Sequence, residues 1–337
     1  MSKQYRVGVM GATGAVGTLM LQVLEERKFP VAEVRPLASA RSLGKTVPFM
    51  REQLPVQELT EQSFRGLDLV LASAGASVSR QFAKHAVEAG AVVVDNTSAF
   101  RMESEVPLVV PEVNPEDIFK HRGIIANPNC STIIMLVAVN PLHRAAKVKR
   151  IVASTYQAVS GTGAKAIAEL DQQVRQWARG EAVTRQVYPY QIAFNVLPQI
   201  DVFMENGYTK EEMKMVNETR KMLHDDSIQV SATTVRVPVF TSHSETIQIE
   251  TEKKLSAQEA RRILGQAPGV RVVDDPAHQR YPMPLETSGQ DEVWVGRIRE
   301  DISHPSGLAL WVVGDQLRKG AATNAVQIAE ILVQGKV

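Results

Sequence analysis

Short apolar runs alternate with helix-like segments over the first third of the chain. Tyr5–Met10 has the composition of a strand, and Leu67–Ala72 is a continuous apolar run of the kind found in strands buried on both faces. Two more strands are predicted at Val34–Ala38 and Ala91–Val94, with a helix at Gln81–Ala89. Alternation of this kind predicts βαβ units and a doubly wound parallel sheet.

The pattern changes near residue 128. Helices are predicted at Ile133–Val139 and Lys165–Ala178, and Ser256-x-x-Glu259 is a capping box that opens another helix. Strands dominate the remainder, and several alternate polar with apolar residues as half-exposed antiparallel strands do. The predicted strands are Arg150–Tyr156, Ile228–Val237, Glu245–Glu250, Glu292–Arg299 and Leu308–Val313.

The closing segment Asn324–Val333 is helical and apolar on one side, so we expect it to pack back against the first domain. That domain is then discontinuous, spanning residues 1–128 and 317–337, and the second domain spans 129–316. The predicted fold class is α/β. A Rossmann-like doubly wound parallel sheet forms the first domain, and an α+β domain with a largely antiparallel sheet forms the second.

Composition narrows the classes of function. The 337 residues are 44% hydrophobic and 22% charged, which excludes a disordered or collagen-like chain. The formal net charge of +1 lacks the basic excess of a nucleic-acid-binding domain, so no nucleic-acid partner is expected. No apolar stretch approaches the about 18 residues that span a bilayer, and no signal-like apolar core follows the N-terminus. We therefore expect a cytoplasmic protein without a membrane partner.

A glycine-rich loop, GATGAVG at 11–17, lies between the first predicted strand and a helix-length segment. Glycines allow a tight turn and let backbone N–H groups approach a pyrophosphate, which the helix N-terminus attracts. The spacing is related to the dinucleotide fingerprint but weaker alone, and a plain strand–turn–helix is the alternative. Because strand, turn and helix are in register, we predict dinucleotide binding. The expected contacts are Gly11, Thr13, Gly14, Ala15 and Val16.

The end of the second strand bears on which dinucleotide binds. NAD-binding folds usually place an acidic residue there to bond the ribose 2′-hydroxyl. Here the strand runs into Ser39-Ala40-Arg41-Ser42, which contains no acid. Arg41 and Ser42 could hold a 2′-phosphate by charge and hydrogen bonding, so NADP is predicted over NAD. A solvated loop arginine is the alternative.

The single cysteine lies in NPNCST at 127–132, directly before an apolar helix. One cysteine cannot form an intrachain disulfide or a cysteine-rich zinc site, and no metal is expected. Pro128 disfavours helical geometry at the preceding residue, and Asn129 is a good residue for starting a helix. Cys130 therefore lies at a helix N-terminus, where partial positive charge favours the thiolate. A lone cysteine is more often a small buried hydrophobe, but this polar context indicates a nucleophile.

A nucleophilic thiol requires a base, and the chain has seven histidines. Most of them lie in charged helical or loop segments, where an exposed histidine is the ordinary reading. His243 differs because it follows the predicted strand Thr233–Phe240 within a tight Thr-Ser-His-Ser-Glu context. A loop at a strand end commonly presents a catalytic group, so His243 is the predicted base.

These residues resemble the aspartate-semialdehyde dehydrogenase family over nearly the whole chain. Beyond the motifs already quoted, the resemblance includes DNTSAFRM at 95–102, TYQAVSGTG at 155–163, EEMKMVNET at 211–219 and RVPVFTSHSE at 236–245. It implies an oxidoreductase that reduces L-aspartyl 4-phosphate with NADPH to L-aspartate 4-semialdehyde and releases phosphate. This is an early step in lysine, diaminopimelate, threonine and methionine biosynthesis. It also implies a homodimer formed through the second domain, which carries catalysis and substrate binding, while the first binds NADP.

The resemblance also implies a role for each matched residue. Cys130 forms a thioester, His243 acts as acid and base with a pKa near neutrality, and Gln157 orients the acyl group. Arg236 grips the substrate carboxylate with two donors, and Glu211 meets the ammonium, although Glu212 is equally placed in the motif. The implied phosphate ligands are Arg101, Lys214 and Asn129. The residues implied at the nicotinamide end are Ser160, Gly161 and Gln316.

Three other functions remain open at this stage, and one of them is a redox-sensing single cysteine, which predicts reversible oxidation without hydride transfer. N-acetyl-glutamyl-phosphate reductase shares the architecture and the thiol mechanism, but its substrate carries no free ammonium that needs an acidic partner. A catalytically silent NADP-binding paralogue belongs to a different class. It could lose its nucleophile, whereas this chain keeps Cys130, Gln157, Arg236 and His243 together.

Overall fold

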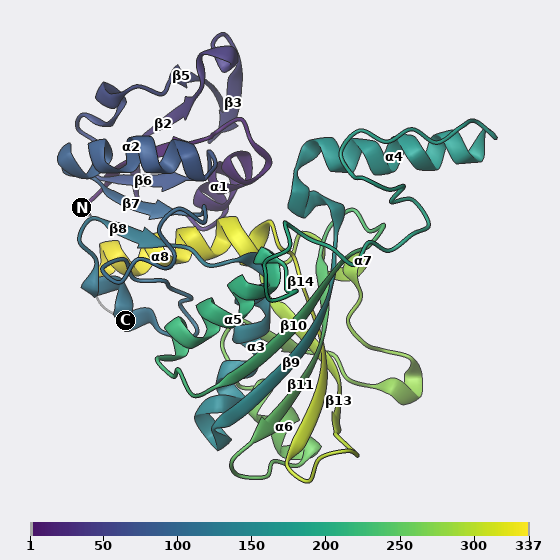
Figure 1. The fold of residues 1–337 in the computed structure, drawn as a ribbon. Coiled ribbons are helices and arrows are strands. Elements are labelled where there is room, and N and C mark those ends of the chain that lie inside the picture. The colour runs from purple at the N-terminus through teal and green to yellow at the C-terminus, as the bar shows by residue number, and fades with distance from the viewer. Residues whose placement is uncertain (1–2, 336–337) are drawn as a thin grey trace. The chain divides into compact units, whose positions relative to one another are not determined.

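A computed structural model of the chain describes residues 3–335, and they form two compact units. The first contains the residues up to Asn129 and those from Ala321 onward, and the second contains Cys130–Gly320 (Figure 1). Residues 1–2 and 336–337 of the first predicted domain lie outside the described residues. Between residues 3 and 335, no helix has the length and apolar character needed to cross a membrane.

The described part of the first unit is built on a six-stranded parallel sheet with the order β5-β2-β1-β6-β7-β8. Its strands are β1 (Tyr5–Met10), β2 (Val31–Ala38), β5 (Gln57–Glu58), β6 (Leu69–Ala72), β7 (Val92–Asp95) and β8 (Ile124–Ala126). The order reverses where β1 pairs with both β2 and β6. Ligands of such sheets bind at the carboxyl ends of the strands beside this reversal, which is where the glycine loop begins.

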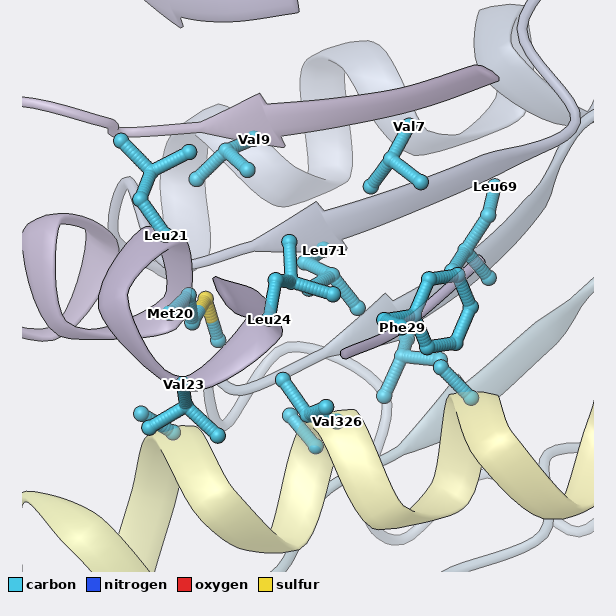
Figure 2. Close-up of a cluster of buried hydrophobic side chains, with 14 of the residues drawn as sticks. Val7, Val9, Met20, Leu21, Val23, Leu24, Phe29, Leu69, Leu71 and Val326 are labelled. Carbon is cyan, nitrogen blue, oxygen red and sulfur yellow. The ribbon is translucent and has the colours of Figure 1, made fainter. Parts of the chain in front are cut away.

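Helices cover both faces of this sheet. Alternate strand residues divide between two apolar clusters, one packed against α1 (Ala15–Glu26) and α8 (Thr323–Gln334) and the other against α2 (Ala76–Glu88). Figure 2 shows Leu24 and Leu71 within the first cluster, with Val326 projecting from α8, the yellow helix. The closing helix thus packs within the first unit, as the sequence predicted. Smaller elements are β3 (Thr46–Phe49), β4 (Glu52–Pro55) and the 3₁₀ helices Ala40–Ser42, Glu61–Phe64 and Pro115–Lys120.

The second unit contains a mixed sheet with the order β10-β9-β11-β14-β13-β12. The inner pairings are antiparallel, while each edge strand pairs in parallel with its neighbour. The strands are β9 (Val148–Gln157), β10 (Gln229–Arg236), β11 (His243–Thr251), β12 (Val270–Val272), β13 (Val293–Glu300) and β14 (Gly307–Gly314). The α/β class with a largely antiparallel second sheet is therefore confirmed.

The helices of the second unit are α3 (Cys130–Ala146), α4 (Ala164–Ala178), α5 (Lys210–Leu223), α6 (Ala257–Leu264) and α7 (Pro284–Thr287). The 3₁₀ helices are Val159–Thr162 and Pro276–His278, and a π-helical segment spans Arg318–Ala322. The Ser256 capping box opens α6 as expected, since the Ser256 hydroxyl accepts from the Glu259 N–H at 3.2 Å. Helix α3 is longer than predicted because it continues past Pro141 and is buried on nearly all sides, so its sequence lacks an amphipathic period.

We expect Leu24→Ala to lower the free energy of unfolding by about 2–5 kcal/mol, because Leu24 is 0% exposed and its removal leaves a cavity. Leu43→Ala is the control in the same unit: this side chain is 51% exposed, so a change of at most about 0.5 kcal/mol is expected. Urea unfolding followed by circular dichroism measures both. Equal losses for the two variants would contradict the assignment of the core.

Candidate active site

The glycine loop closes tightly between β1 and α1. Gly11 has a φ of 88°, and a Cβ built on it would lie 2.8 Å from the Ser73 carbonyl oxygen at the end of β6. A Cβ on Gly17 would overlap the Gly11 carbonyl oxygen, so α1 packs directly on the turn. Gly14 is the N-cap of α1 and brings no side-chain cap to its first N–H groups. Thr13, Gly14 and Ala15 are exposed, so this end of the helix is open to an anion.

The loop after β2 adds the groups expected for a 2′-phosphate. The Thr13 and Ser42 hydroxyls are 3.3 Å apart, which joins the glycine loop to the end of β2. Arg41 is exposed beside them, and the segment Ser39–Leu43 contains no acid. A glycine-rich turn, an open helix N-terminus and an exposed guanidinium suit a dinucleotide that carries a 2′-phosphate.

A second cluster lies at the carboxyl ends of β7 and β8. The Arg101 guanidinium donates from Nε to the Asn127 carbonyl at 2.9 Å and from Nη2 to the Asn96 carbonyl at 3.0 Å. Asn127 is fully buried, donates from Nδ2 to Asn96 Oδ1, and accepts from Asn324 Nδ2 at 2.7 Å. Sequence reasoning missed this role of Asn127. It anchors the segment that continues through the buried Asn129.

Cys130 is the first residue of α3 and is half-buried. The side chain therefore leaves the chain at the N-terminus of a 17-residue helix, where the first N–H groups favour an anion. Gly320 lies against it, since a Cβ built there would lie 2.9 Å from the Cys130 Cβ.

Three of the predicted residues lie at one end of the second sheet. Gln157 ends β9, Arg236 ends β10, and His243 begins β11. Gln157 and Arg236 are register partners, and all three side chains are at most 5% exposed. The prediction that His243 lies in a loop after a strand is wrong: β10 stops at Arg236, and His243 itself opens the next strand. The strand pairing holds the imidazole more rigidly than a loop would.

The backbone N–H and carbonyl of one residue, Ala158, fix two of these side chains. The Ala158 N–H donates to His243 Nδ1 at 3.0 Å, and the Ala158 carbonyl accepts from Arg236 Nη1 at 2.6 Å. His243 Nε2 and Arg236 Nε have no hydrogen-bond partner within residues 3–335. Because Nδ1 accepts, a neutral ring carries its proton on Nε2. The N–H groups at His243 Nε2 and Arg236 Nε can therefore each donate a hydrogen bond to a ligand.

Burial lowers the pKa of His243 well below its usual value, and the Arg236 charge lowers it further. The expectation of a pKa near neutrality therefore does not hold for this fully buried ring. At neutral pH the imidazole is uncharged and presents Nε2–H.

The acidic and basic residues of α5 face the same strand ends. The Gln157 amide donates to Glu211 Oε1 at 3.3 Å, and Lys214 Nζ lies 3.0 Å from Glu211 Oε2. Burial acts to lower the pKa of Lys214, but Glu211 and Asp201 together raise it above the usual value. Glu212 is engaged elsewhere, because it accepts from the Thr209 and Thr234 N–H groups. Of the two candidate carboxylates, only Glu211 reaches Gln157.

Glu245 is a buried acid that sequence reasoning left without a role. It lies two residues after His243 on the same face of β11, opposite Thr155 of β9. Its carboxyl oxygens lack hydrogen-bond partners among the residues that the structure describes, and burial raises its pKa well above the usual value, with the Glu211 charge raising it further. Only the period-two spacing from His243 could have revealed Glu245.

The residues predicted at the nicotinamide end surround His243. Gln316 Oε1 accepts from the Ser242 N–H at 2.8 Å, and its Nε2 donates to the Ser160 hydroxyl. Ser242 has a φ of 71°, so this bond steadies a backbone turn directly before the histidine. A Cβ on Gly161 would lie 3.3 Å from His243 Cε1, so a larger residue at this position would crowd the edge of the ring.

The structure thus brings together, in the second unit, residues that the sequence separates by nearly 190 positions. These are Cys130, Gln157, Ser160, Gly161, Glu211, Lys214, Arg236, His243 and Gln316. The glycine loop, Arg41, Ser42, Arg101 and Asn129 belong to the first unit. Across residues 3–335, no group of three or more His, Cys, Asp or Glu side chains is arranged to hold a metal ion.

Comparison with known proteins identifies both units. Residues 6–121 match the family model "Semialdehyde dehydrogenase, NAD binding domain", and residues 139–319 match "Semialdehyde dehydrogenase, dimerisation domain". Among curated relatives, the aspartate-semialdehyde dehydrogenase of Aquifex aeolicus is 58% identical over 334 residues, which are 98% of each chain.

Solved structures agree with the sequence relatives. Aspartate semialdehyde dehydrogenase II of Vibrio cholerae, complexed with ASA, is 50% identical, covers 99% of each chain and superposes with a TM-score of 0.97. The Candida albicans aspartate semialdehyde dehydrogenase with NADP is 27% identical over 98% of each chain, with a TM-score of 0.76. Extended identity, matching domain models and a shared fold together show that the chain belongs to the aspartate-semialdehyde dehydrogenase family.

Proposed function

We propose that this protein reduces L-aspartyl 4-phosphate to L-aspartate 4-semialdehyde with NADPH, reversibly, through a thioester on Cys130. The observation that carries the proposal is the cluster of Gln157, Arg236 and His243 at one end of the second sheet, with the cysteine at a helix N-terminus in the same unit. The names of the relatives, and the ASA and NADP in two related structures, support the substrate and the cofactor.

The chemistry begins at the sulfur. The Cys130 thiolate attacks the acyl carbon, the new C–S bond forms, and the C–O bond to the phosphoryl group breaks, so that phosphate leaves and takes up one proton. A nicotinamide cofactor, when bound, supplies the hydride that reduces the thioester carbon. The C–S bond then breaks, and the electron pair returns to sulfur, which regenerates the thiolate. The N–H groups at the start of α3 stabilise the sulfur anion at both ends of this cycle.

His243 acts on the acyl oxygen. Its Nε2–H points away from the Ala158 bond and has no competing partner within the described chain, so it can donate to an oxygen that gains negative charge. A neutral ring is the form that burial favours. In the reverse direction the same Nε2–H donates to the alkoxide oxygen that forms when the thiolate adds to the aldehyde. Gln157, fastened to Glu211, orients the acyl group with its amide.

Charge complementarity supports the substrate assignment. Arg236 offers a planar fork for the α-carboxylate, and Glu211 offers a carboxylate for the α-ammonium. Arg101, Lys214 and Asn129 supply donors for the phosphoryl group. The position of Glu211 beside Gln157 favours a free ammonium over an N-acetyl group, which needs no anion. Assaying both semialdehydes with phosphate and NADP separates this function from N-acetyl-glutamyl-phosphate reduction.

Assembly and location follow from the same family. We propose a homodimer formed through the second unit, in line with the dimerisation-domain model that matches residues 139–319. A single cysteine fits a reducing compartment, where a catalytic thiol stays reduced, so the cytoplasm is the proposed location.

Cys130→Ser is expected to abolish phosphate-dependent reduction of NADP by aspartate semialdehyde, because an alcohol at this position is not ionised at neutral pH. NADPH affinity, measured by fluorescence titration, and the thermal midpoint should stay near wild type. Substantial residual turnover in this variant would exclude the thioester route.

Arg236→Lys is expected to raise the KM for aspartate semialdehyde about tenfold or more, since one point charge replaces a fork and loses about 1.4 kcal/mol or more of binding. Arg150→Lys, on the exposed face of the same sheet, is the matched control and should keep its KM. Initial-rate kinetics measure both variants. A wild-type KM for Arg236→Lys would refute the carboxylate role.

Arg41→Ala is expected to raise the KM for NADPH about tenfold while leaving the KM for NADH unchanged, because only NADPH carries the 2′-phosphate. Arg51→Ala, which removes another exposed positive charge from the first unit, serves as the control. If the NADPH-to-NADH preference is the same in wild type and Arg41→Ala, the solvated-arginine alternative holds instead.

A further inference from the structure

Gly320 is a glycine whose backbone does not require one. It lies in the π-helical segment Arg318–Ala322, and its φ is not among the positive values of the chain's glycines. The space that a side chain on this residue would occupy is instead filled by neighbouring atoms. A Cβ built on Gly320 would lie 2.9 Å from the Cys130 Cβ, 3.3 Å from the Cys130 Cα and 3.3 Å from the Gln316 Cβ. Contacts under 3.0 Å between such atoms do not persist, so any larger residue must displace something.

The nucleophile's side of this contact is rigid. Cys130 opens α3, and the next four residues of that helix are fully buried. Ile134, one turn on, packs against Gly314, where a built Cβ would lie 3.0 Å from the Ile134 Cγ1. The start of α3 therefore has little room to retreat.

The segment that contains Gly320 is also restrained, by hydrogen bonds and an ion pair. Its N–H donates to the Asp315 carbonyl at 3.1 Å. The Asp315 carboxylate accepts from the Leu317 N–H at 2.9 Å and from the Gly289 N–H at 2.7 Å. Arg318, within the segment, forms an ion pair with Asp291 at 2.7 Å. A new Cβ on residue 320 would therefore displace both the start of α3 and the stretch Asp315–Gly320, although packing or hydrogen bonds restrain each of them.

The same segment reaches the predicted acid and base. Gln316 packs at the Gly320 position through its Cβ, and its amide holds the Ser242 N–H, directly before His243. One short stretch, Asp315–Gly320, therefore touches the cysteine at one end and steadies the histidine through Gln316. Its geometry fixes the distance between the two groups that must act on one acyl carbon and its oxygen.

We propose that Gly320 is a positioning residue for the nucleophile: the absence of a Cβ there sets the place of the Cys130 sulfur at the N-terminus of α3 and relative to His243. This inference rests on the proposed function, because it assigns the role within the thioester step. Gly320 itself touches no reacting atom.

The first test is Gly320→Ala in the full-length enzyme. Moving a reacting group by a fraction of an ångström to an ångström costs up to about 100-fold in rate, so kcat should fall about 10- to 100-fold. The KM for aspartate semialdehyde and the NADPH affinity should change less than about threefold, because neither ligand contacts residue 320 in this scheme. Gly265→Ala is the matched control. It adds a Cβ at ordinary backbone geometry, 3.2 Å from the Arg261 carbonyl at the end of α6, and should keep wild-type kcat.

The thiol itself reports the displacement. Cys130 is the single cysteine, so alkylation by iodoacetamide followed against pH reports on it alone. A sulfur moved away from the first N–H groups of α3 loses stabilisation of its anion, so the alkylation profile of Gly320→Ala should move to higher pH. A purely structural role would lower the thermal midpoint and leave kcat per folded enzyme and this profile at wild-type values, which would overturn the proposal.

A double-mutant cycle tests whether the new Cβ collides with Cys130, even if Gly320→Ala folds poorly. Cys130→Gly removes the Cβ that the alanine would strike, so the loss in thermal midpoint caused by Gly320→Ala should shrink in the Cys130→Gly background. An equal loss in both backgrounds would show that the clash lies elsewhere and refute the proposal. If wild-type enzyme fails to turn over aspartate semialdehyde, the proposed function fails, while alkylation and the cycle still judge whether Gly320 positions the thiol.

Discussion

The backbone of Ala158 is the constraint on which the site depends. Its N–H holds His243 Nδ1, and its carbonyl holds Arg236 Nη1, so two side chains from different strands share one fixed reference. Buried polar groups must be hydrogen-bonded, and the N–H and the carbonyl of this one residue satisfy half of each side chain while leaving the other half open. The open halves, His243 Nε2–H and the remaining Arg236 donors, are the groups that a substrate with an acyl oxygen and a carboxylate would meet.

Burial then sets the charges around that reference. It lowers the pKa of His243, so that the imidazole is neutral beside the charged Arg236, and it raises the pKa of Glu245, which the Glu211 charge raises further. Glu211 and Lys214 form a pair that preserves one carboxylate close to Gln157. The second unit therefore presents a small number of defined charges instead of a diffuse polar surface, which suits a substrate that carries an ammonium, a carboxylate and a phosphoryl group.

Most of the architecture could be predicted because it follows from local periodicity. The strand ends at Met10 and Ala72 and the capping box at Ser256 depend on neighbouring residues, and the structure places all three as expected. Helix α3 was predicted too short because burial on all sides removes the amphipathic signal, and the start of β11 was predicted at Glu245, two residues late, because its first residues are polar.

The same distinction between local and long-range information applies to the site. The types of the chemical groups could be predicted from motifs, since thiol, imidazole and guanidinium occur in recognisable runs. Their relations could not, because they arise from strand register and from contacts distant in sequence. The choice of Glu211 over Glu212 depends on which carboxylate the edge of β10 engages, and the role of Gly320 depends on a helix that starts 190 residues earlier. Neither relation leaves a trace in local sequence.

The covalent state of Cys130 during turnover tests the account most directly. Enzyme mixed with L-aspartyl 4-phosphate in the absence of NADPH, quenched in acid within milliseconds and analysed by peptide mass spectrometry, should carry one aspartyl group on the Cys130 peptide. Addition of NADPH before the quench should remove it. An unmodified Cys130 peptide, in enzyme that turns over the same substrate when NADPH is present, would contradict the thioester and the assignments built on it.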